Sequence, residues 1–469
     1  MREIDGKVCM KLPDYVKKII DALESAGYEA YAVGGCVRDS LLGLTPDDYD
    51  VTTSATPDEM KKSLMHEDFT IHDTGLQHGT VTVVVDDSVA NKTCCSGEQR
   101  LVCEVTTFRV DGEYSDNRRP DSVTFTRSLR EDMSRRDFTV NAMAYSEKAG
   151  LCDYFGGRRD LDNKLIRAVG EPHKRFGEDG LRILRALRFA GVYGFSVEEN
   201  TAAAVRGLKG LIKGISGERI AAELNKLVMG EVSGVIYDYA EVFAEFISEI
   251  ADCKDFDQRS VYHDRDVLTH TLNALDSAPR DKVTRLALLF HDLGKPACFR
   301  LIEDADGGSH GSFKGHPAVS EQIARRVMRS LKYDNDTFYK VATLVKFHDI
   351  PVKADVKSVK CLLNRFGEEM FFRLIDVHIA DYSAKRNERA QDITIFREAA
   401  ETAKRIIAEN QCFSLERLAV KGGDLVALGF KGREVGEKLE LLLHAVISEK
   451  CVNDKEVLIE FLRNPTKEK

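Results

Sequence analysis

The sequence predicts an α+β protein in which a mixed N-terminal domain is followed by a long all-helical extension. Between residues 30 and 145, short runs rich in β-branched side chains alternate with turn residues, as expected for the strands of a sheet. Beyond residue 160, amphipathic runs follow one another and almost no strand pattern remains. A chain of 469 residues is also too long for one hydrophobic core, and its length predicts about three to four domains.

The individual elements follow from local patterns. Apolar residues recur at helical spacing at Ile19, Ile20 and Leu23, so the first 30 residues are predicted to form a helix. Strands are predicted for three runs, at residues 80–85, 101–110 and 122–126. In the helical part, the Gly- and Asp-rich stretch 303–315 is predicted to be the most mobile loop.

Composition excludes several classes of protein. Hydrophobic residues make up 43% of the chain and charged residues 31%, which is typical of soluble globular proteins. No run approaches the roughly 18 apolar residues of a membrane span, and the N-terminal stretch MREIDGKVCMKLPDYVKKII has no signal-peptide core. The 11 cysteines include no C-x-x-C pair, which favours reduced thiols. We therefore expect a cytoplasmic protein without a membrane partner.

Charge is distributed unevenly along the chain. The net charge of −9 argues against an obligate nucleic-acid coat protein. Residues 151–230 nevertheless hold 14 Lys and Arg against 10 Asp and Glu. This asymmetry indicates an RNA or nucleotide partner for the basic segment.

Two carboxylates, Asp48 and Asp50, follow a Gly-Gly turn in the stretch YAVGGCVRDSLLGLTPDDYDVTT. In a strand over residues 48–52 they would point to the same face and could bracket one or two Mg²⁺ ions. The glycines let backbone N–H groups approach phosphate oxygens, and Arg38 adds a guanidinium fork that matches phosphate. The combination is typical of two-metal nucleotidyl transfer. A D-x-D pair alone is more often a solvated turn, so both interpretations stand at this point.

A row of charged residues follows in the run EDGLRILRALRF. Asp179 and Arg182 are three residues apart and would be neighbours on one helix face, and Arg185 and Arg188 extend the row. A carboxylate can accept from the exocyclic amine of C or A while a guanidinium donates to ring acceptors, so such a pair could read either base and reject U and G. The alternative is an ordinary helix with internal salt bridges.

Five motifs occur in the order found in the class II tRNA nucleotidyltransferase and poly(A) polymerase family, which the sequence resembles over most of its length. They are GGCVRDSLLGLTPDDYDV, RRDFTVNAMAY, DYFGGRRDLDNKLIRAVG, EDGLRILRALRF and SGERIAAEL. Near the C-terminus, VKGGDLVALGFKGREVGEKLELLLHAV is similar to the tail helices of the CCA-adding members.

The resemblance implies a role for each matching residue. Asp48 and Asp50 would hold Mg²⁺, and Glu104, on a predicted neighbouring strand, is the candidate third carboxylate, with a strand-edge charge as the alternative. The nucleotide-binding residues implied are Gly35 and Arg38 at the triphosphate, Arg136 and Asp137 near the ribose, and Asp179, Arg182, Arg185 and Arg188 at the base. Arg185 and Arg188 could instead hold Asp179 in place or contact phosphate.

A second constellation of His and Asp residues lies in the helical part. It resembles the H…HD…D ligand set of the HD phosphohydrolase superfamily, which implies a metal site at His270, His291, Asp292 and Asp381. Imidazole and carboxylate ligands would suit Mg²⁺, Mn²⁺, Ni²⁺ or Fe. His316 and His348 lie in the same part of the chain. The alternative is a set of core histidines without a metal.

The two resemblances together imply an architecture and a function. The parts would be a nucleotidyltransferase-fold head at 1–147, a helical neck and body at 148–255, an HD-type helical domain at 256–385 and a tRNA-binding helical tail at 386–469. The implied activity is addition of C, C and A to tRNA 3′ ends from CTP and ATP. The alternatives are a poly(A) polymerase, a CC-adding member, and an HD phosphohydrolase acting on nucleotides or RNA ends. The pattern gives no oligomeric state.

Overall fold

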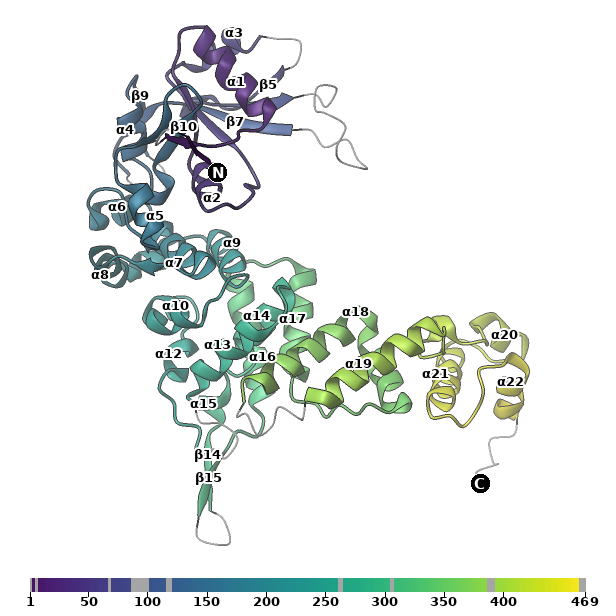
Figure 1. Cartoon of the computed structure of the whole chain (residues 1–469). Coiled ribbons are helices and arrows are strands. Elements are labelled where there is room, and N and C mark those ends of the chain that lie inside the picture. The colour runs from purple at the N-terminus through teal and green to yellow at the C-terminus, as the bar shows by residue number, and fades with distance from the viewer. Residues whose placement is uncertain are drawn as a thin grey trace. The chain divides into compact units, whose positions relative to one another are not determined.

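The computed structural model (Figure 1) contains a mixed sheet and many helices, and it divides into two compact units, Met1–Leu227 and Val228–Lys469. It describes residues 2–4, 7–65, 69–85, 101–114, 120–259, 265–303, 308–385 and 393–463. Among these residues, no helix is long and apolar enough to cross a membrane. The predicted α+β class, with a mixed sheet first and helices after it, is confirmed.

A seven-stranded sheet forms the centre of the first unit, in the order β11-β10-β3-β4-β7-β6-β5. Its strands are β3 Ala30–Val33, β4 Asp50–Thr53, β5 Phe69–Gly75, β6 Thr80–Val85, β7 Leu101–Thr107, β10 Met143–Ser146 and β11 Gly150–Asp153. β4 and β7 pair in parallel, whereas the other neighbours in the sheet are antiparallel. The predicted strand at 80–85 is confirmed, and its alternate residues Val81, Val83 and Val85 are buried.

Helices pack on this sheet, and the first begins later than the sequence suggested. The helices are α1 Asp14–Ser25, α2 Gly35–Leu41 and α3 Pro57–Ser63. Ile19, Ile20 and Leu23 form the buried face of α1, as predicted. The prediction of a helix over the whole of residues 1–30 was wrong, because β1 Arg2–Ile4 pairs with β2 Lys7–Cys9. Pro13 precedes the helix, where its fixed φ angle suits a helix start.

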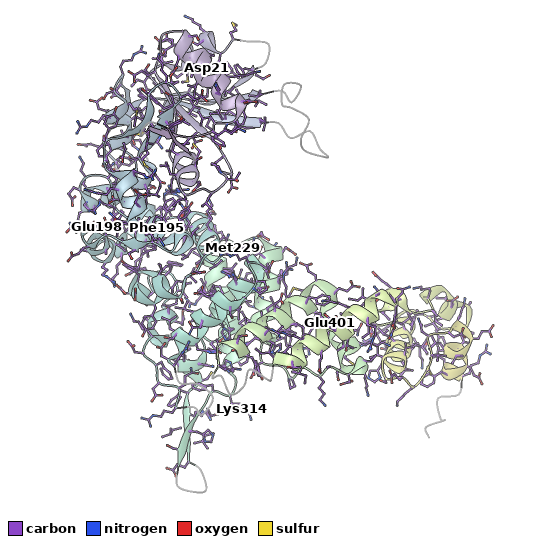
Figure 2. The ribbon with its side chains drawn as sticks, viewed as in Figure 1. Asp21, Phe195, Glu198, Met229, Lys314 and Glu401 are labelled. Atoms are coloured by element: carbon purple, nitrogen blue, oxygen red, sulfur yellow. The ribbon has the colours of Figure 1, made fainter. Side chains whose placement is uncertain are left out.

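The remaining elements of the first unit are mainly helical. They are η1 Leu76–His78, β8 Arg109–Asp111, β9 Val123–Phe125, α4 Leu129–Ser134, η3 Thr139–Asn141, α5 Gly157–Asp162, β12 Leu165–Ile166, α6 Pro172–Glu178, α7 Leu181–Tyr193, β13 Ser196–Val197, α8 Glu199–Gly207, η4 Lys209–Gly214 and α9 Gly217–Leu227. The predicted strand 101–110 is divided into β7 and β8 at Phe108, which is fully buried. Glu198, labelled in Figure 2, caps α8 by accepting from the N–H of Thr201 at 3.0 Å.

In the part that the structure describes, the second unit is helical apart from one hairpin. Its helices are α10 Ser233–Asp238, α11 Ala240–Phe243, α12 Glu249–Cys253, α13 Val267–Ser277, α14 Lys282–Phe290, α15 Lys295–Cys298, α16 His316–Ser330, α17 Asn335–Phe347, α18 Val356–Ser383, α19 Ile393–Ala408, η6 Leu415–Arg417, α20 Gly422–Ala427, α21 Arg433–Ile447 and α22 Lys455–Arg463. The hairpin pairs β14 Arg300–Glu303 with β15 Ser309–Ser312 and extends away from the helices (Figure 1).

This hairpin corrects the sequence-based view of residues 303–315. The stretch was predicted to be a loop, yet Glu303 pairs with Ser309 in the hairpin. Residues 304–307 of the predicted loop lie outside the described residues. Short exposed strands of this kind leave little signal in the sequence, because neither face has to be apolar.

Two apolar clusters stabilise the later helices. One joins α18 and α19 through Val359, Phe371 and Phe396. The other joins α20, α21 and α22 through Leu425, Leu442 and Leu458. The unit boundary after Leu227 falls inside the segment predicted as neck and body, residues 148–255. The finer division into four parts stays a prediction.

Candidate functional site

The centre of the sheet brings predicted catalytic carboxylates onto neighbouring strands. β4 begins at Asp50, and Asp48 lies two residues before it rather than within a strand. In the parallel pairing of β4 with β7, Asp50 is in register with Glu104. Residues in register on neighbouring strands project to the same face. Asp50 and Glu104 therefore lie side by side, and Asp48 lies in the segment that precedes β4.

The electrostatics of Asp50 reflect these neighbours. Burial raises the pKa of Asp50 to about 6, and the carboxylates of Asp48 and Glu104 act in the same direction, while Arg136 opposes them. The side chain keeps access to water, which screens part of this effect. Such a group of acids favours the arrival of positive charge.

The Gly-Gly turn leads from β3 into α2. Gly34 has φ 79°, a conformation that favours glycine, and a Cβ there would lie 3.0 Å from the Arg136 guanidinium. Gly35 is the first residue of α2. Arg38 is buried, and its nitrogens donate to Asp39 at 2.8–2.9 Å and to Asn141 at 2.6 Å.

Aromatic rings cover the guanidinium of Arg38. Its Cζ lies 5.0 Å from the ring centre of Phe189 and 4.8 Å from that of Tyr193. The predicted triphosphate contact would require Arg38 to exchange some of these partners. Its role at phosphate stays a prediction.

Arg136 and Asp137 make different contacts. Arg136 lies 3.7 Å from the buried Asp132. Asp137 accepts from Arg185 at 2.8 Å and from the Asn141 amide at 3.1 Å. Burial would raise the pKa of Asp137, but the Arg185 guanidinium and the Asn141 amide outweigh it and hold the pKa well below its usual range. Asp137 therefore anchors Arg185, and a contact between Asp137 and a ribose stays a prediction.

The predicted position of Asp179 within a helix was wrong. α6 ends at Glu178, and Asp179 is extended, with φ −144° and ψ 106°. Its side chain accepts from the N–H of Leu181 at 3.0 Å at the start of α7 and pairs with Arg219 at 2.8 Å. Asp favours such capping positions, and the following Gly180 is a poor helix former.

The three arginines of the predicted row do lie on α7, but each has its own acidic partner. Arg182 pairs with Glu178 at 2.6 Å. Arg185 pairs with Asp137, as described, and Arg188 pairs with Glu223 at 2.5 Å.

A polar pocket of about 540 Å³ contains two of the predicted base-reading residues, Asp179 and Arg182. Other polar residues in its lining are Thr74, Gln77, His78, Arg109, Asp111, Tyr114 and Arg135. Reasoning from sequence did not assign Asp111, Tyr114 or Arg135. Asp111 and Tyr114 lie outside the five motifs, and Arg135 lies in the motif RRDFTVNAMAY but was given no role. Asp111 links them, since it accepts from the Tyr114 hydroxyl at 2.8 Å and lies 3.8 Å from Arg135.

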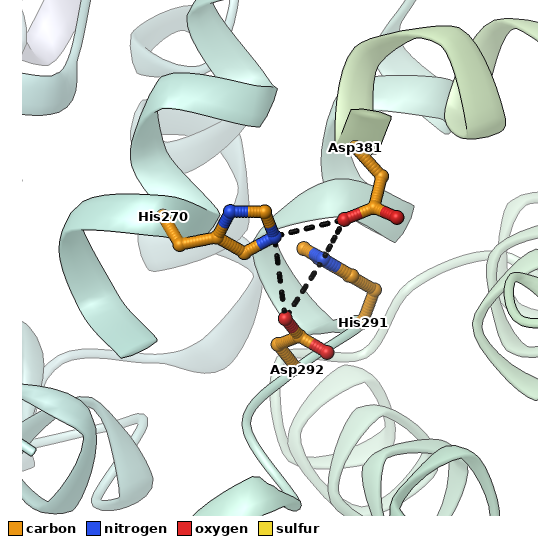
Figure 3. Close-up of side chains that lie close together, drawn as sticks. All are labelled: His270, His291, Asp292 and Asp381. Atoms are coloured by element: carbon orange, nitrogen blue, oxygen red, sulfur yellow. Dashed lines mark hydrogen bonds and ion pairs between the residues drawn. The ribbon is translucent and has the colours of Figure 1, made fainter. Parts of the chain in front are cut away.

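In the second unit, the predicted metal ligands converge from three places in the chain (Figure 3). His270 is on α13, His291 and Asp292 follow α14, and Asp381 is near the end of α18. Four ligand atoms, one from each residue, lie within 4.8 Å of one another. As whole residues, Asp381 is 6% exposed and the other three are each 1% exposed.

The distances within this group match a shared ion. His270 Nε2 lies 2.8 Å from Asp381 Oδ1 and 3.5 Å from Asp292 Oδ2. His291 Nε2 lies 3.2 Å from Asp292 Oδ2 and 3.5 Å from Asp381 Oδ1. Ligand atoms at about 2.0–2.2 Å from one ion would be about 2.8–3.6 Å apart. The residues therefore fit a divalent metal without rearrangement.

The ionisable side chains of this cluster change one another's pKa values. Burial lowers the pKa of His291, but the carboxylates of Asp292 and Asp381 outweigh burial and raise it to about 10. Burial would raise the pKa of Asp292, yet His291 and Lys295 hold it well below its usual range. The cluster therefore favours positive charge at its centre.

Comparisons with known proteins agree along the chain. A model of the Poly A polymerase head domain matches residues 30–167, and a model of tRNA nucleotidyltransferase domain 2 matches residues 316–462. CCA-adding enzymes of Lacticaseibacillus paracasei and Enterococcus faecalis are 47% and 46% identical to this chain over 212 residues. The chain is therefore similar, over these segments, to proteins of the tRNA nucleotidyltransferase and poly(A) polymerase family.

Coverage differs between the sequence and structure comparisons. The chain spans about half the length of the curated relatives it matches, 49% and 48% for the two named. A crystal structure of the Bacillus stearothermophilus CCA-adding enzyme in complex with CTP is similar over 98% of this chain and 100% of that chain, with a TM-score of 0.70 and 29% identity. The similarity to these nucleotidyltransferases implies a divalent metal ion.

Proposed function

We propose that the protein adds C, C and A to the 3′ ends of tRNA from CTP and ATP and releases pyrophosphate. The observation that carries the proposal is the pairing of β4 with β7. It sets Asp50 beside Glu104 within the segment that matches the Poly A polymerase head domain. The similarity to the CTP-bound CCA-adding enzyme over nearly the whole chain supports the choice of nucleotides. A substrate tRNA makes a cytoplasmic location the natural expectation.

The carboxylates Asp48, Asp50 and Glu104 would hold Mg²⁺ in this reaction. Mg²⁺ is typically bound by one or two carboxylates together with substrate phosphates. When bound, it would lower the pKa of the tRNA 3′-hydroxyl and stabilise the departing pyrophosphate. The raised pKa of Asp50 fits this role, because burial first, and the carboxylates of Asp48 and Glu104 in addition, disfavour its negative charge, which a cation would stabilise.

The nucleotide base would lie in the pocket beside Asp179 and Arg182. The Asp179 carboxylate would accept from the exocyclic amine of C or A, and Arg182 would donate to a ring acceptor. Both side chains are held by other groups, Asp179 by Arg219 and Arg182 by Glu178. These partners would fix the orientation of the pair before a nucleotide arrives.

The other family activities make different products. A poly(A) polymerase would extend a tail of A residues, and a CC-adding enzyme would stop after two C residues. The sequence 111–122 favours full CCA addition, because it is similar to the complete flexible loop of CCA-adding members. Residues 115–119 of this loop lie outside the described residues.

One assay separates these possibilities. The full chain is incubated with tRNA that lacks its 3′-terminal CCA, with Mg²⁺ and with labelled CTP, ATP or UTP, and the products are resolved by length. We expect two additions from CTP, one further addition from ATP and none from UTP. A long ladder from ATP alone, or arrest after two C residues with both nucleotides present, would contradict CCA addition.

A second activity is supported by the His and Asp cluster of the second unit. We propose that His270, His291, Asp292 and Asp381 bind a transition metal such as Mn²⁺, Ni²⁺ or Fe and that the site hydrolyses phosphate esters of nucleotides or RNA ends. The spacing of the four ligand atoms is the observation that favours it.

Melting of the full chain with and without Mn²⁺ tests the metal site. A ligand at 100 times its Kd stabilises by about 2.7 kcal/mol, so we expect the transition to rise by several degrees. The variant Asp381→Ala should lose this response. A melting temperature that is indifferent to Mn²⁺ and Ni²⁺ in the parent chain would leave the cluster structural.

A further inference from the structure

One buried carboxylate of the head, Asp132, is not among the proposed metal ligands. It lies on α4 and is fully buried. A buried carboxylate is costly unless cations and hydrogen-bond donors surround it. Burial alone would raise the pKa of Asp132, but the guanidinium groups of Arg135 and Arg136 outweigh burial and lower it. Asp132 is therefore ionised at neutral pH and holds two arginines.

The two carboxylate oxygens of Asp132 have different partners. Oδ1 accepts from Arg135 Nε at 2.9 Å and from the backbone N–H of Arg109 at 3.3 Å. Oδ2 accepts from the Thr52 hydroxyl at 3.2 Å and lies 3.7 Å from Arg136 Nη2. Oδ2 is thus the oxygen directed to β4 and to Arg136.

Thr52 connects Asp132 to the strand that carries Asp50. Thr52 and Asp50 both belong to β4 and are two residues apart, so their side chains project to the same face. Thr52 is fully buried, whereas Asp50 is exposed. Asp132 therefore contacts the same face of β4 that presents Asp50.

Arg136 lies where two acids compete for it. Its Nη1 is 3.0 Å from the position that a Cβ on Gly34 would take, so the guanidinium lies against the Gly-Gly turn. Burial and Asp48 raise the pKa of Asp50, whereas Arg136 lowers it, so the charge of Arg136 acts on Asp50. Among the described residues, however, Arg136 pairs with Asp132 and makes no ion pair with Asp50. Its Nε is buried and makes no hydrogen bond.

The competition decides what Asp50 can bind. An arginine paired with Asp50 would neutralise the charge that attracts Mg²⁺ and would occupy a carboxylate oxygen that the ion needs. An arginine held at the Gly-Gly turn instead presents its guanidinium beside the proposed triphosphate site, where its geometry matches phosphate. The partner that holds Arg136 therefore affects both the metal and the nucleotide.

We propose that Asp132 is a positioning residue that holds Arg136 at the Gly-Gly turn and keeps it from pairing with Asp50, so that Asp50 stays available to Mg²⁺. This inference rests on the nucleotide addition proposed above. Asp132 contacts neither the metal nor the nucleotide in this role, because it is fully buried and acts through Arg136.

The Mg²⁺ dependence of C addition tests this role. The full chain and its variant Asp132→Asn are assayed with tRNA that lacks its CCA end, at saturating CTP, and the initial rate is measured against free Mg²⁺. Asn keeps the shape of the side chain and one acceptor oxygen but has no charge to hold Arg136. A guanidinium within about 4–6 Å stabilises a carboxylate by about a factor of ten or more, so we expect the Mg²⁺ concentration for the half-maximal rate to rise about tenfold. Saturating Mg²⁺ should restore most of the rate, because competition can be overcome.

Removal of the competing arginine separates positioning from a general structural role. In Asp132→Asn combined with Arg136→Gln, no guanidinium is left to pair with Asp50, so the Mg²⁺ requirement should return to that of Arg136→Gln alone. The KM for CTP should stay raised, because the contact of Arg136 with phosphate is lost. Asp132→Glu keeps the charge and should need little more Mg²⁺ than the parent chain.

Asp160 supplies the matched control. It is a second buried carboxylate of the first unit, 1% exposed, and it pairs with Arg167 at 3.0 Å. It lies on α5 and has no contact with Arg136. Asp160→Asn should therefore leave the half-saturating Mg²⁺ concentration unchanged, whatever its effect on the rate. Circular dichroism of each variant checks that the chain is folded.

Several results would overturn the proposal. They are an unchanged Mg²⁺ requirement in folded Asp132→Asn, an equal rise in Asp160→Asn, and a loss of rate that excess Mg²⁺ does not restore. If Asp132→Asn does not fold, Arg136→Gln decides, since a Mg²⁺ requirement below that of the parent supports the proposal and one at or above it overturns it. A parent chain that adds no nucleotide would overturn the proposed function and this inference with it, whereas an active parent with any of the contrary results would overturn the inference alone.

Discussion

The two candidate metal sites of this protein differ in how much of the site the protein itself supplies. At the head, Asp48, Asp50 and Glu104 are all exposed, and among the described residues they do not form a group of ligand atoms within 4.8 Å. In the helical unit, the ligands are buried and already at mutual distances that suit an ion. If both sites bind metal as proposed, the head would leave coordination positions for the oxygens of a triphosphate, whereas the helical cluster would provide most ligands itself.

The comparison indicates that exposed carboxylates and buried, preformed ligand groups suit different kinds of metal site. A nucleotide that arrives with its metal needs an open, negatively charged face. A resident ion needs preformed ligands, because burying the carboxylates without a cation would be costly. The variants below test whether the sites are separate in function as well as in design.

The largest expected effect is in the head. Asp48→Ala or Asp50→Ala should lower incorporation of both C and A by at least about 100-fold, since stabilisation of transition-state charge is lost. Binding of tRNA, measured by gel shift, should persist. Asp47→Ala is the matched control, because Asp47 is an exposed acid in the same turn. Near-normal incorporation by either Asp48 or Asp50 variant would contradict the metal assignment.

The second-largest expected effect is on the selection between nucleotide bases. Asp179→Ala should raise misincorporation of UTP relative to CTP about tenfold or more, because a lost edge contact is worth about 1–3 kcal/mol of discrimination. Arg219→Ala should relax selectivity less than Asp179→Ala, since it removes the ion pair that orients Asp179 while leaving the carboxylate in the pocket. If both variants relax selectivity against UTP equally, the effect comes from a change in the position of α7 and not from loss of the carboxylate. Unchanged selectivity in Asp179→Ala would assign base reading to other residues.

The pH dependence of nucleotide addition should report Asp50. Its pKa is raised to about 6, so below this pH the carboxyl binds a proton and competes poorly for metal. We expect kcat/KM at low Mg²⁺ to fall as pH drops through about 6, and rising Mg²⁺ should move this limb to lower pH. The sign for stability is opposite, because a raised acid pKa favours the folded state below pH 6 and this contribution is lost as pH rises. If the fall in kcat/KM at low pH did not shift with Mg²⁺ concentration, the assignment of Asp50 as a metal ligand would be contradicted.

The smallest expected effect on nucleotide addition comes from the helical cluster. His291→Ala combined with Asp292→Ala should leave CCA addition unchanged, because neither residue belongs to the head site. The same variant should lose any metal-dependent opening of 2′,3′-cyclic phosphate ends or release of phosphate from 2′-phosphorylated ends. Circular dichroism at the assay temperature checks that the chain is folded. A parallel loss of CCA addition in folded protein would show that the two sites depend on each other.

Sequence patterns predicted the elements whose faces are buried and missed those defined by single residues. The alternation of Val81, Val83 and Val85 predicted β6 correctly, because one face packs into the core. The break at Asp179 and Gly180 was missed, since apolar helical spacing continues on both sides of it.

The candidate sites show the same limit. The position of Glu104 beside the D-x-D strand was expected, but its register with Asp50 depends on strand pairing that local sequence does not encode. The four ligands of the helical cluster came from a recognisable pattern. His316 and His348 were not assigned as ligands, because a helix start and a helix end meet there only through tertiary packing.

The contacts of the histidine Nδ1 atoms bear on how this protein can diverge. His291, His316 and His348 each donate to the carbonyl oxygen three residues earlier, at Leu288, Phe313 and Val345. Every amino acid supplies that oxygen, so mutation cannot delete the acceptor. The orientation of the imidazoles is therefore inherited with the backbone. The side chains of Leu288, Phe313 and Val345 can therefore be substituted as packing allows, without loss of these hydrogen bonds. Residues around the cluster can change during evolution while the three imidazole rings keep their orientation.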